Sequence, residues 1–437
     1  MFNNISKIYK KFKEYLDNTL WIMGDKFIGL GVSFIVAVIV ARYLGPKDFG
    51  VYSYVWSLVT LFSVAGHMGL SGLVVREIVG KPEERAVVLG TTFTLKLIGM
   101  SVGYLCLLIY AYIYEGMSSV EFLLIAIAGT TLILRCFDVF DYWFQSFVQA
   151  KYVSIANIIG LLVSSSLKVI FVLLGVSLSF FIYPGVLHVV VIGLILMFFY
   201  YYKSSLSLKD WTFSWGKAKE LLGQGWLIYL GSIFAIINLK VDQIMLKWYL
   251  GSEEVGIYAV AAQLSEAWYF IPTAIVASFF PKLIELRKSN YLEYEMRLQQ
   301  LFNVLFLMSI VVAIVVTISG EFIINLFFGG EYRASANILV VHIWAAVFIF
   351  MRALFSRWIL LEDALIFSLL TQAVGAVANI VLNYYWINLY GTVGAAYATF
   401  FSYAGSSFLA LFLYSKTRPI FWMMCKAMVL HSMVFKR

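Results

Sequence analysis

The segments YLGPKDFGVYS (43–53) and YLGSEEVGIYA (249–259) repeat each other within one chain. They share Tyr, Leu, Gly, Gly and Tyr at the same spacing, which is more identity than two loops need in order to end one helix and start the next. In each copy a glycine follows an apolar stretch, where a helix readily ends. Pro46 then suits the first turn of the following helix, and Ser252 suits an N-cap. The repeat predicts that the chain is a duplicated helical unit.

The composition around these segments belongs to a membrane protein. Hydrophobic residues make up 62% of the 437 residues and charged residues 13%, whereas a soluble domain has roughly 25% charged residues. The mean hydropathy is +0.88. Because one helical span needs about 20 apolar residues, the chain supplies about twelve spans with little left over. A soluble enzyme is excluded.

Twelve apolar segments are the predicted transmembrane helices. The loops between them are short, which leaves no room for a soluble catalytic domain. The segments cover residues 20–43, 49–74, 88–114, 121–147, 153–175, 178–201, 225–248, 255–280, 299–327, 335–360, 365–388 and 392–414.

The distribution of basic residues predicts the orientation. One set of alternate loops, together with both chain ends, holds about 22 of the 32 Lys and Arg residues, and such loops face the cytoplasm. Both termini are therefore expected in the cytoplasm. The predicted parts are a cytoplasmic N-terminal segment (1–19), a first six-helix half (20–202), a cytoplasmic linker (203–224), a second six-helix half (225–416), and a cytoplasmic or interfacial tail (417–437).

The two copies of the repeat are separated by six spans. Because six is even, both halves have the same orientation, and their symmetry axis should lie along the membrane normal. We therefore predict an all-α polytopic membrane protein with about 12 transmembrane helices, in two parallel six-helix repeats around a central cavity.

Five segments together resemble the Wzx-type O-antigen flippases: VARYLGPKDFGVYS (40–53), GLSGLVVREI (69–78), KVDQIMLKWYLG (240–251), EVGIYAVAAQLSEAWYFIPTAIVASFFPKL (254–283) and GEYRASANILVVHIWAAVF (330–348). The resemblance covers nearly the whole chain. It implies the superfamily of multidrug, oligosaccharidyl-lipid and polysaccharide exporters, with a fold like those of MATE exporters and the lipid II flippase. The implied activity moves undecaprenyl-pyrophosphate-linked oligosaccharides from the cytoplasmic to the periplasmic leaflet of the bacterial inner membrane. A polysaccharide polymerase and a chain-length regulator are the implied protein partners.

Cations within the predicted spans are the candidate substrate-binding residues. Charges at this depth are costly and usually face protein or water. Arg135 has an acid three residues later, Asp138, with which it can pair along the helix; alternatively, its planar fork suits a pyrophosphate in a cavity. Lys26 can instead extend to the headgroups. Convergence of the cations would form a chamber for phosphates or acidic sugars, and scattered interhelical ion pairs are the alternative. The candidates are Arg135, Lys240, Lys96, Lys168, Arg352 and Lys26.

Three carboxylates within the spans, Asp242, Glu266 and Asp25, are the candidates for ion coupling. Lys240 and Asp242 are two positions apart and project about 200° from each other on a helix. They cannot simply pair with one another, so at least one of them needs a partner or a cavity elsewhere. The alternative for Asp242 is an interhelical salt bridge, and the alternative for Glu266 is a hydrogen-bonded structural glutamate.

Other chemistries lack their signatures. The chain has no G-x-x-x-x-G-K-[ST] motif for nucleotide phosphates, and its four histidines lack metal-ligand spacing. We therefore expect no cofactor, no metal centre, no nucleic-acid partner and no enzymatic activity. The hypothesis is a flippase that works by alternating access, with ion coupling. An ion-coupled multidrug exporter would favour a carboxylate-rich chamber, and a membrane glycosyltransferase or polymerase would need a long outer catalytic loop.

Overall fold

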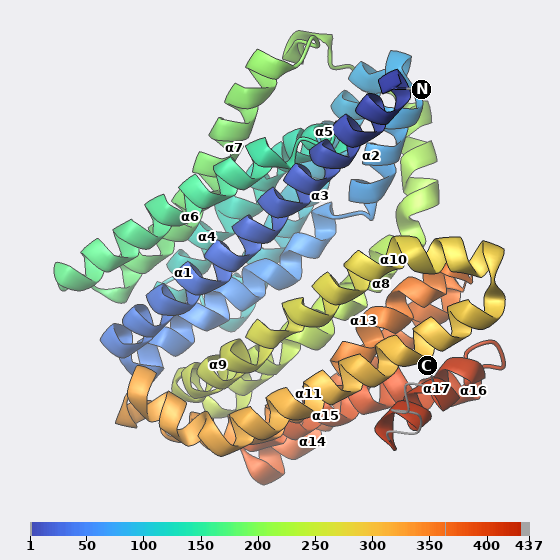
Figure 1. The fold of residues 1–437 in the computed structure, drawn as a ribbon. Coiled ribbons are helices and arrows are strands. Elements are labelled where there is room, and N and C mark those ends of the chain that lie inside the picture. Colours follow the sequence, from blue (N-terminus) through green and yellow to red (C-terminus); the bar gives the residue numbers. More distant parts are fainter. Residues whose placement is uncertain (1, 363, 430–437) are drawn as a thin grey trace. The chain divides into compact units, whose positions relative to one another are not determined.

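A computed structural model of the chain describes the backbone of residues 2–362 and 364–429, and the side chains of residues 17–429 except those of residues 363 and 365. All regular structure in these residues is helical (Figure 1). The α-helices are α1 (Phe2–Ser63), α2 (Leu70–Gly80), α3 (Arg85–Tyr114), α4 (Val120–Leu134), α5 (Val139–Ser146), α6 (Ala150–Leu173), α7 (Tyr183–Lys203), α8 (Trp215–Leu250), α9 (Ser252–Glu266), α10 (Phe270–Ser289), α11 (Tyr291–Phe327), α12 (Ser335–His342), α13 (Ala346–Leu361), α14 (Leu365–Tyr390), α15 (Thr392–Ala404), α16 (Ala410–Leu413) and α17 (Arg418–Met428).

The predicted spans are confirmed. Among the described residues, 11 continuous helical stretches are long and apolar enough to cross a membrane. The first, Asp17–Gly66, has 50 residues, more than twice the length that one crossing needs. It contains the first predicted segment and most of the second, which was predicted to continue to residue 74, and it changes direction at Gly45. The other ten each correspond to one predicted segment, with ends that differ by up to 10 residues, as at Trp215, where the prediction began at residue 225.

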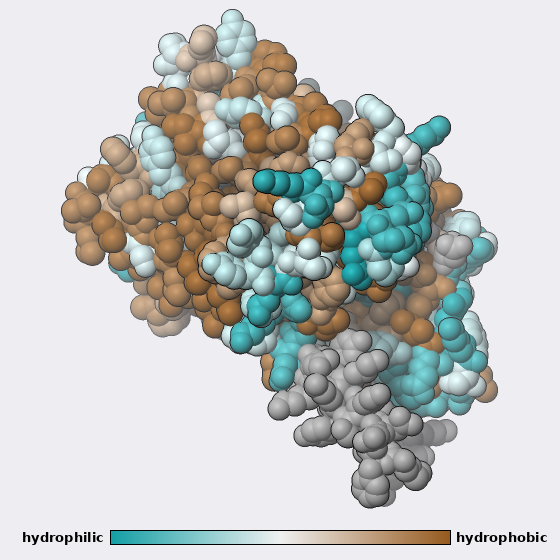
Figure 2. Space-filling view, turned by 90° about the horizontal axis from the view of Figure 1, so that it is seen from above, coloured by the Kyte–Doolittle hydropathy of each residue, from teal (hydrophilic) through white to brown (hydrophobic). Residues whose placement is uncertain are grey.

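The outer surface fits a lipid environment. Hydrophobic side chains cover much of the face shown in Figure 2, and hydrophilic ones are gathered in patches. Leu173 and Leu413 are each 80% exposed, and Ile318 is 79% exposed. Large apolar side chains in such numbers on the surface require apolar surroundings, which a bilayer supplies.

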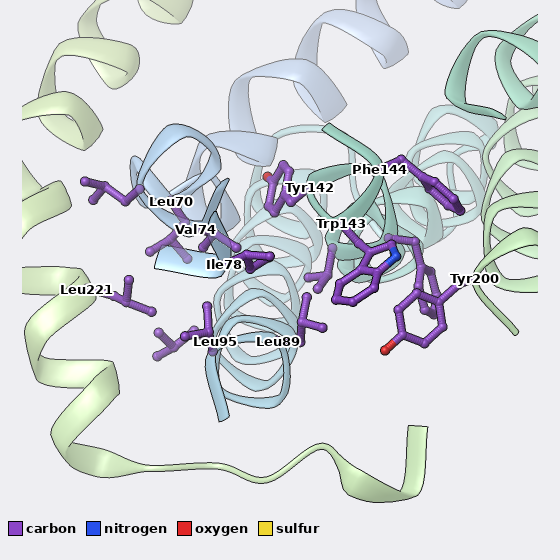
Figure 3. Close-up of a cluster of buried hydrophobic side chains, with 14 of the residues drawn as sticks. Leu70, Val74, Ile78, Leu89, Leu95, Tyr142, Trp143, Phe144, Tyr200 and Leu221 are labelled. Carbon is purple, nitrogen blue, oxygen red and sulfur yellow. The ribbon is translucent and has the colours of Figure 1, made fainter. Parts of the chain in front are cut away.

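Contacts divide the chain into two compact units. Unit 1 comprises the residues up to Leu44 together with Val55–Ser232, and unit 2 comprises Gly45–Tyr54 and the residues from Ile233 onwards. In unit 1, α3 packs on α4 and α6 on α7, and in unit 2, α14 packs on α15 and α11 on α13. The helix α8 contributes to both units. The core of unit 1 includes Trp143 and Tyr200, which meet edge to face between α5 and α7 (Figure 3).

The same two spans of each half are interrupted near the middle. The second and fourth spans of the first half contain 3₁₀ turns at Val64–Gly66 and Arg135–Asp138. The second and fourth spans of the second half contain them at Ala267–Tyr269 and Ile343–Ala345. This correspondence supports the duplication, and such turns often mark functional or strained positions.

The repeated glycines end their helices as predicted. Gly45 has φ 71° and ψ 172°, and Gly251 has φ 92° and ψ −178°, a region that is essentially restricted to glycine. The expectation for Ser252 is wrong. It is the first residue of α9 rather than its cap, and its hydroxyl accepts a hydrogen bond from Lys247 Nζ at 2.7 Å.

Two further glycines of the repeat meet within unit 2. A methyl group added to Gly50 would overlap the carbonyl oxygen of Ser252, and one added to Gly256 would overlap the carbonyl oxygen of Pro46. The helix that follows Gly45 and the helix that follows Gly251 therefore cross with their backbones in contact. Only glycine allows this approach, as at other small-residue crossings in membranes.

The short C-terminal helix α17 lies on unit 2. It buries Ile420, Met424 and Ala427, which share one face, and exposes Trp422. Its eleven residues are too few to cross a bilayer; a cytoplasmic or interfacial position of the tail stays a prediction. The final segment of that tail, 430–437 with His431, lies outside the described residues, as do the side chains of the predicted N-terminal segment up to residue 16.

An ionic cluster anchors the start of α8 to α2 within unit 1. Lys217 Nζ lies 3.2 Å from Glu77, 2.6 Å from Glu84 and 2.8 Å from Glu220, and Lys81 lies 3.2 Å from Glu77. Burial opposes the ionisation of Glu77, but the ammonium groups of Lys81 and Lys217 outweigh it and hold the pKa of this carboxyl below its usual value. The cluster fixes the first turns of the helix that carries the candidate ion site.

We predict that Gly50→Ala and Gly256→Ala each lower the free energy of unfolding by about 1–3 kcal/mol, because the added methyl group forces the two backbones apart. Thermal unfolding of the purified protein in detergent measures this. Gly72→Ala is the matched control, because Gly72 has open space around it. Equal melting temperatures for Gly50→Ala and Gly72→Ala would contradict the close crossing.

We predict that Lys217→Met destabilises the protein by about 1–3 kcal/mol near pH 7, since it leaves Glu77, Glu84 and Glu220 with the ammonium group of Lys81 alone to offset their charges. The pKa of Glu77 is lower in the folded protein than its unfolded value of about 4.3, so the ionised carboxyl stabilises the fold at pH values above about 4.3. This stabilisation is lost as the pH falls through the folded-state pKa. The loss in melting temperature should therefore be large at pH 7 and small at pH 3.5. Lys282→Met, which removes an exposed pair with Glu285, should have little effect at either pH; a loss for Lys217→Met that does not depend on pH would refute this role.

Candidate functional site

The most deeply buried of the candidate carboxylates is Asp242 in α8, which is 2% exposed. Tyr258 Oη donates to Asp242 Oδ2 at 2.7 Å, and Thr399 Oγ1 donates to the same oxygen at 2.6 Å. Asn383 Nδ2 donates to Asp242 Oδ1 at 2.7 Å. All three donors are neutral, and no described cation lies within 4 Å. A buried carboxylate in this setting needs a proton or a bound cation to offset its charge.

The hydrogen bonds around Asp242 extend through four helices. Asn383 Nδ2 also contacts Asn379 Oδ1 at 2.8 Å, and Asn379 Nδ2 donates to Ser402 Oγ at 3.3 Å. Ser402 Oγ in turn donates to Asn238 Oδ1 at 3.3 Å. With Tyr258 of α9, the network therefore joins α8, α9, α14 and α15 inside unit 2.

Sequence reasoning identified Asp242 but missed its partners. Asn379 and Asn383 lie one helical turn apart in an apolar span, and Thr399 and Ser402 lie three residues apart in the next. Amide and hydroxyl side chains at helical spacing within a span were the available signal, because such groups need hydrogen-bond partners in hydrocarbon.

Lys240 pairs with Glu266 rather than with Asp242, at 3.5 Å. The expectation that Lys240 and Asp242 do not pair is consistent with this geometry. Both members of the pair are partly exposed, at 18% and 25%. One candidate substrate-binding cation and one candidate coupling carboxylate therefore neutralise each other across two helices of unit 2.

Arg352 lines a second polar feature of unit 2, a pocket of about 250 Å³. Its Nη1 donates to Ser407 Oγ at 3.1 Å, within the π-helical turn Gly405–Leu409. No carboxylate of the described residues lies within 4 Å of the guanidinium. The other polar lining residues are Asn238, Tyr269, Thr273, Ser356, Gln372, Tyr403 and Ser406. Through Asn238 the pocket adjoins the hydrogen-bond network of Asp242.

In unit 1, Lys96 is paired by a residue from another helix. It is 1% exposed, and its Nζ lies 2.9 Å from Asp138 Oδ2 and 3.2 Å from Tyr142 Oη. The local pairing of Arg135 with Asp138 is therefore not what the structure shows. The turn Arg135–Asp138 is 3₁₀, which aligns positions i and i+3, but Asp138 is paired with Lys96 of α3 instead.

Arg135 lines a pocket of about 220 Å³ inside unit 1, together with Asp138, Asp141, Asn157 and His188. Asn157 Nδ2 donates to Oδ2 of Asp25 at 2.9 Å, which links the third candidate carboxylate to the wall of this pocket.

The remaining cations of unit 1 lie near the same groups. Arg135 and Lys168 both act electrostatically on His188, and Lys26 and Lys96 both act on Asp141. The structure therefore brings Lys26, Lys96, Arg135 and Lys168 into one neighbourhood of unit 1, and Lys240, Asp242, Glu266 and Arg352 into one neighbourhood of unit 2. Within the described residues, no three His, Cys, Asp or Glu side chains form a group that could hold a metal ion.

Comparisons with known proteins agree with this architecture. A structure of the lipid II flippase MurJ in an inward closed conformation superimposes with a TM-score of 0.69 at 14% identity, covering 95% of this chain and 91% of that chain. The predicted fold class is confirmed by this likeness and by the helices described above.

Two relatives extend the comparison to function. A putative O-antigen transporter of Shigella flexneri is 24% identical over 403 residues, covering 87% of this chain and 93% of the relative. The probable flippase AglR of Haloferax volcanii is 26% identical over 268 residues, covering 57% of this chain and 52% of the relative. A family model described as polysaccharide biosynthesis protein matches residues 15–287. Because that match spans more than half of the chain, the protein belongs to the polysaccharide biosynthesis protein family.

Proposed function

We propose that the protein is a flippase that moves undecaprenyl-pyrophosphate-linked oligosaccharide repeat units from the cytoplasmic to the periplasmic leaflet of a bacterial inner membrane. Membership of the polysaccharide biosynthesis protein family and the similarity to an O-antigen transporter support this role. Short loops and polar pockets within membrane spans support transport of the glycan rather than chemistry on it. In this proposal the two units alternate access to the two membrane faces, and both termini lie in the cytoplasm.

The observation that carries the proposal is the environment of Arg352. A guanidinium inside a membrane span, with no carboxylate within 4 Å and with amides and hydroxyls around it, is suited to an anionic ligand group. Its planar fork matches phosphate or carboxylate oxygens bidentately. The pyrophosphate linkage, or an acidic sugar next to it, is the group that Arg352 binds in this proposal. Lys240, also in unit 2, adds positive charge once its pair with Glu266 opens.

Ion coupling is assigned in this proposal to Asp242. Its three neutral donors leave the carboxylate able to accept a proton or to coordinate a cation with the surrounding amide and hydroxyl oxygens. Asn238 belongs both to this network and to the pocket of Arg352, so a change at one affects the packing of the other. Glu266 and Asp25 remain secondary candidates, each with a partner of its own. A polymerase and a chain-length regulator are the expected downstream partners.

We predict that Arg352→Gln slows flipping at least tenfold, since one charge-assisted hydrogen bond contributes about 1.5–3 kcal/mol and 1.4 kcal/mol is a factor of ten. The measurement uses proteoliposomes that contain a fluorescent lipid-linked oligosaccharide and a reductant that cannot cross the membrane, which bleaches only the outer leaflet. Lys282→Gln, an exposed change in the same unit, is the control. A wild-type protein that leaves half of the label protected indefinitely would refute the flippase proposal, and an Arg352→Gln rate equal to that of the control would remove Arg352 from the site.

We predict that Asp242→Asn makes the flipping rate independent of sodium and proton gradients, because the amide can neither take up a proton at neutral pH nor supply the charge that a cation needs. The same proteoliposomes, with imposed gradients, measure this. Glu266→Gln should retain the gradient response. If Glu266→Gln abolishes the response and Asp242→Asn does not, the coupling carboxylate is Glu266.

A further inference from the structure

The pocket of Arg135 in unit 1 differs in charge from the pocket of Arg352 in unit 2. Its lining contains one cation, Arg135, and two acids, Asp138 and Asp141. Lys96 neutralises Asp138 from outside the lining, at 2.9 Å. The lining of the pocket of Arg352 contains no acid. An anion in this pocket would therefore share the space with the carboxylate of Asp141, which opposes its binding.

Three polar atoms of the residues that line the Arg135 pocket lack partners. Arg135 Nε, Asp141 Oδ1 and His188 Nδ1 are buried and have no hydrogen-bond partner in the described chain, while Asp141 Oδ2 accepts from Gln145 Nε2 at 3.0 Å. Leaving a buried donor and a buried acceptor unpaired is costly. A hydroxyl group satisfies both kinds of atom, since it donates to a carboxylate and accepts from a guanidinium.

The other residues that line the pocket supply groups suited to binding a sugar ring. Asn157 and His188 add further hydrogen-bonding groups, and Phe137 adds an apolar aromatic face, which stacks on Phe140 outside the pocket. The volume of about 220 Å³ is below the roughly 300–1,000 Å³ of pockets that hold drug-sized ligands. The space is therefore suited to one ring rather than to a whole oligosaccharide.

We propose that this pocket is a subsite for one neutral sugar residue, held through its hydroxyl groups by Arg135 and Asp141. The proposal rests on the proposed function, because it assigns one part of the glycan to unit 1. Asp141 accepts from a hydroxyl, Arg135 donates to a hydroxyl oxygen, and Phe137 faces the C–H side of the ring. The carboxylate of Asp141 also repels uronic acids, so the subsite selects neutral residues at its position in the repeat unit.

Saturation-transfer NMR on the full-length protein in lipid nanodiscs tests the subsite. The probes are methyl β-D-glucopyranoside, methyl β-D-galactopyranoside, methyl N-acetyl-β-D-glucosaminide, methyl β-D-glucuronide and inorganic pyrophosphate. We expect transfer to the ring protons of at least one neutral glycoside and not to the glucuronide, and no displacement of the neutral glycoside by pyrophosphate. Asp141→Asn and Arg135→Gln should each weaken glycoside binding at least tenfold. Lys282→Gln, an exposed change in the other unit, should leave it unchanged.

Each other outcome overturns the proposal. If no neutral glycoside shows transfer, or if Asp141→Asn and Arg135→Gln bind as the wild type does, there is no neutral-sugar subsite here. If pyrophosphate displaces the glycoside and Arg135→Gln abolishes pyrophosphate binding, the pocket is an anion site. Two controls separate a binding defect from misfolding. The melting temperatures of the variants report whether they fold, and Arg135→Lys keeps the positive charge but loses the planar fork. Flipping by the wild type is measured separately in proteoliposomes, so the failure of one proposal is distinguishable from the failure of the other.

Discussion

A bilayer interior contains no water, so every polar group placed there must find a partner within the protein or its ligand. For the backbone this constraint leaves only the helix, and the described chain accordingly consists of helices and short connections. For side chains it explains why Asp242 accepts three hydrogen bonds and why Lys96 is paired with Asp138. Groups that remain unsatisfied, such as Arg135 Nε and Asp141 Oδ1, are then the best indicators of where a ligand binds.

The two units meet this constraint with different chemistry. In unit 2, Asp242 lies among neutral donors, while Arg352 lies in a pocket whose lining has no acid. In unit 1, cations and carboxylates alternate around Arg135 and Lys96. A duplicated fold has thus acquired two unlike interiors. In the functions proposed above, one serves the coupling ion and the anionic linkage and the other serves a neutral part of the glycan.

Breaks in the helices are placed close to these groups. Arg135 and Asp138 lie in a 3₁₀ turn, and Glu266 directly precedes another. Ser407, the partner of Arg352, lies in a π-helical turn. Each break changes the direction in which side chains leave the helix. The i, i+3 spacing of Arg135 and Asp138 did not lead to a local pair, because Asp138 is paired with Lys96 of α3 instead.

By itself the sequence determined the approximate positions and the all-helical nature of the spans, because hydropathy and span length are local properties set by the thickness of the bilayer. It also located the duplicated glycines, since positive φ and close backbone approach leave a signature in residue type. The partners of Lys96, Lys240 and Asp242 were decided only by the tertiary structure. Each of those contacts joins residues far apart in the chain, and which helix faces which depends on the packing of a whole unit rather than on the spacing within any one span.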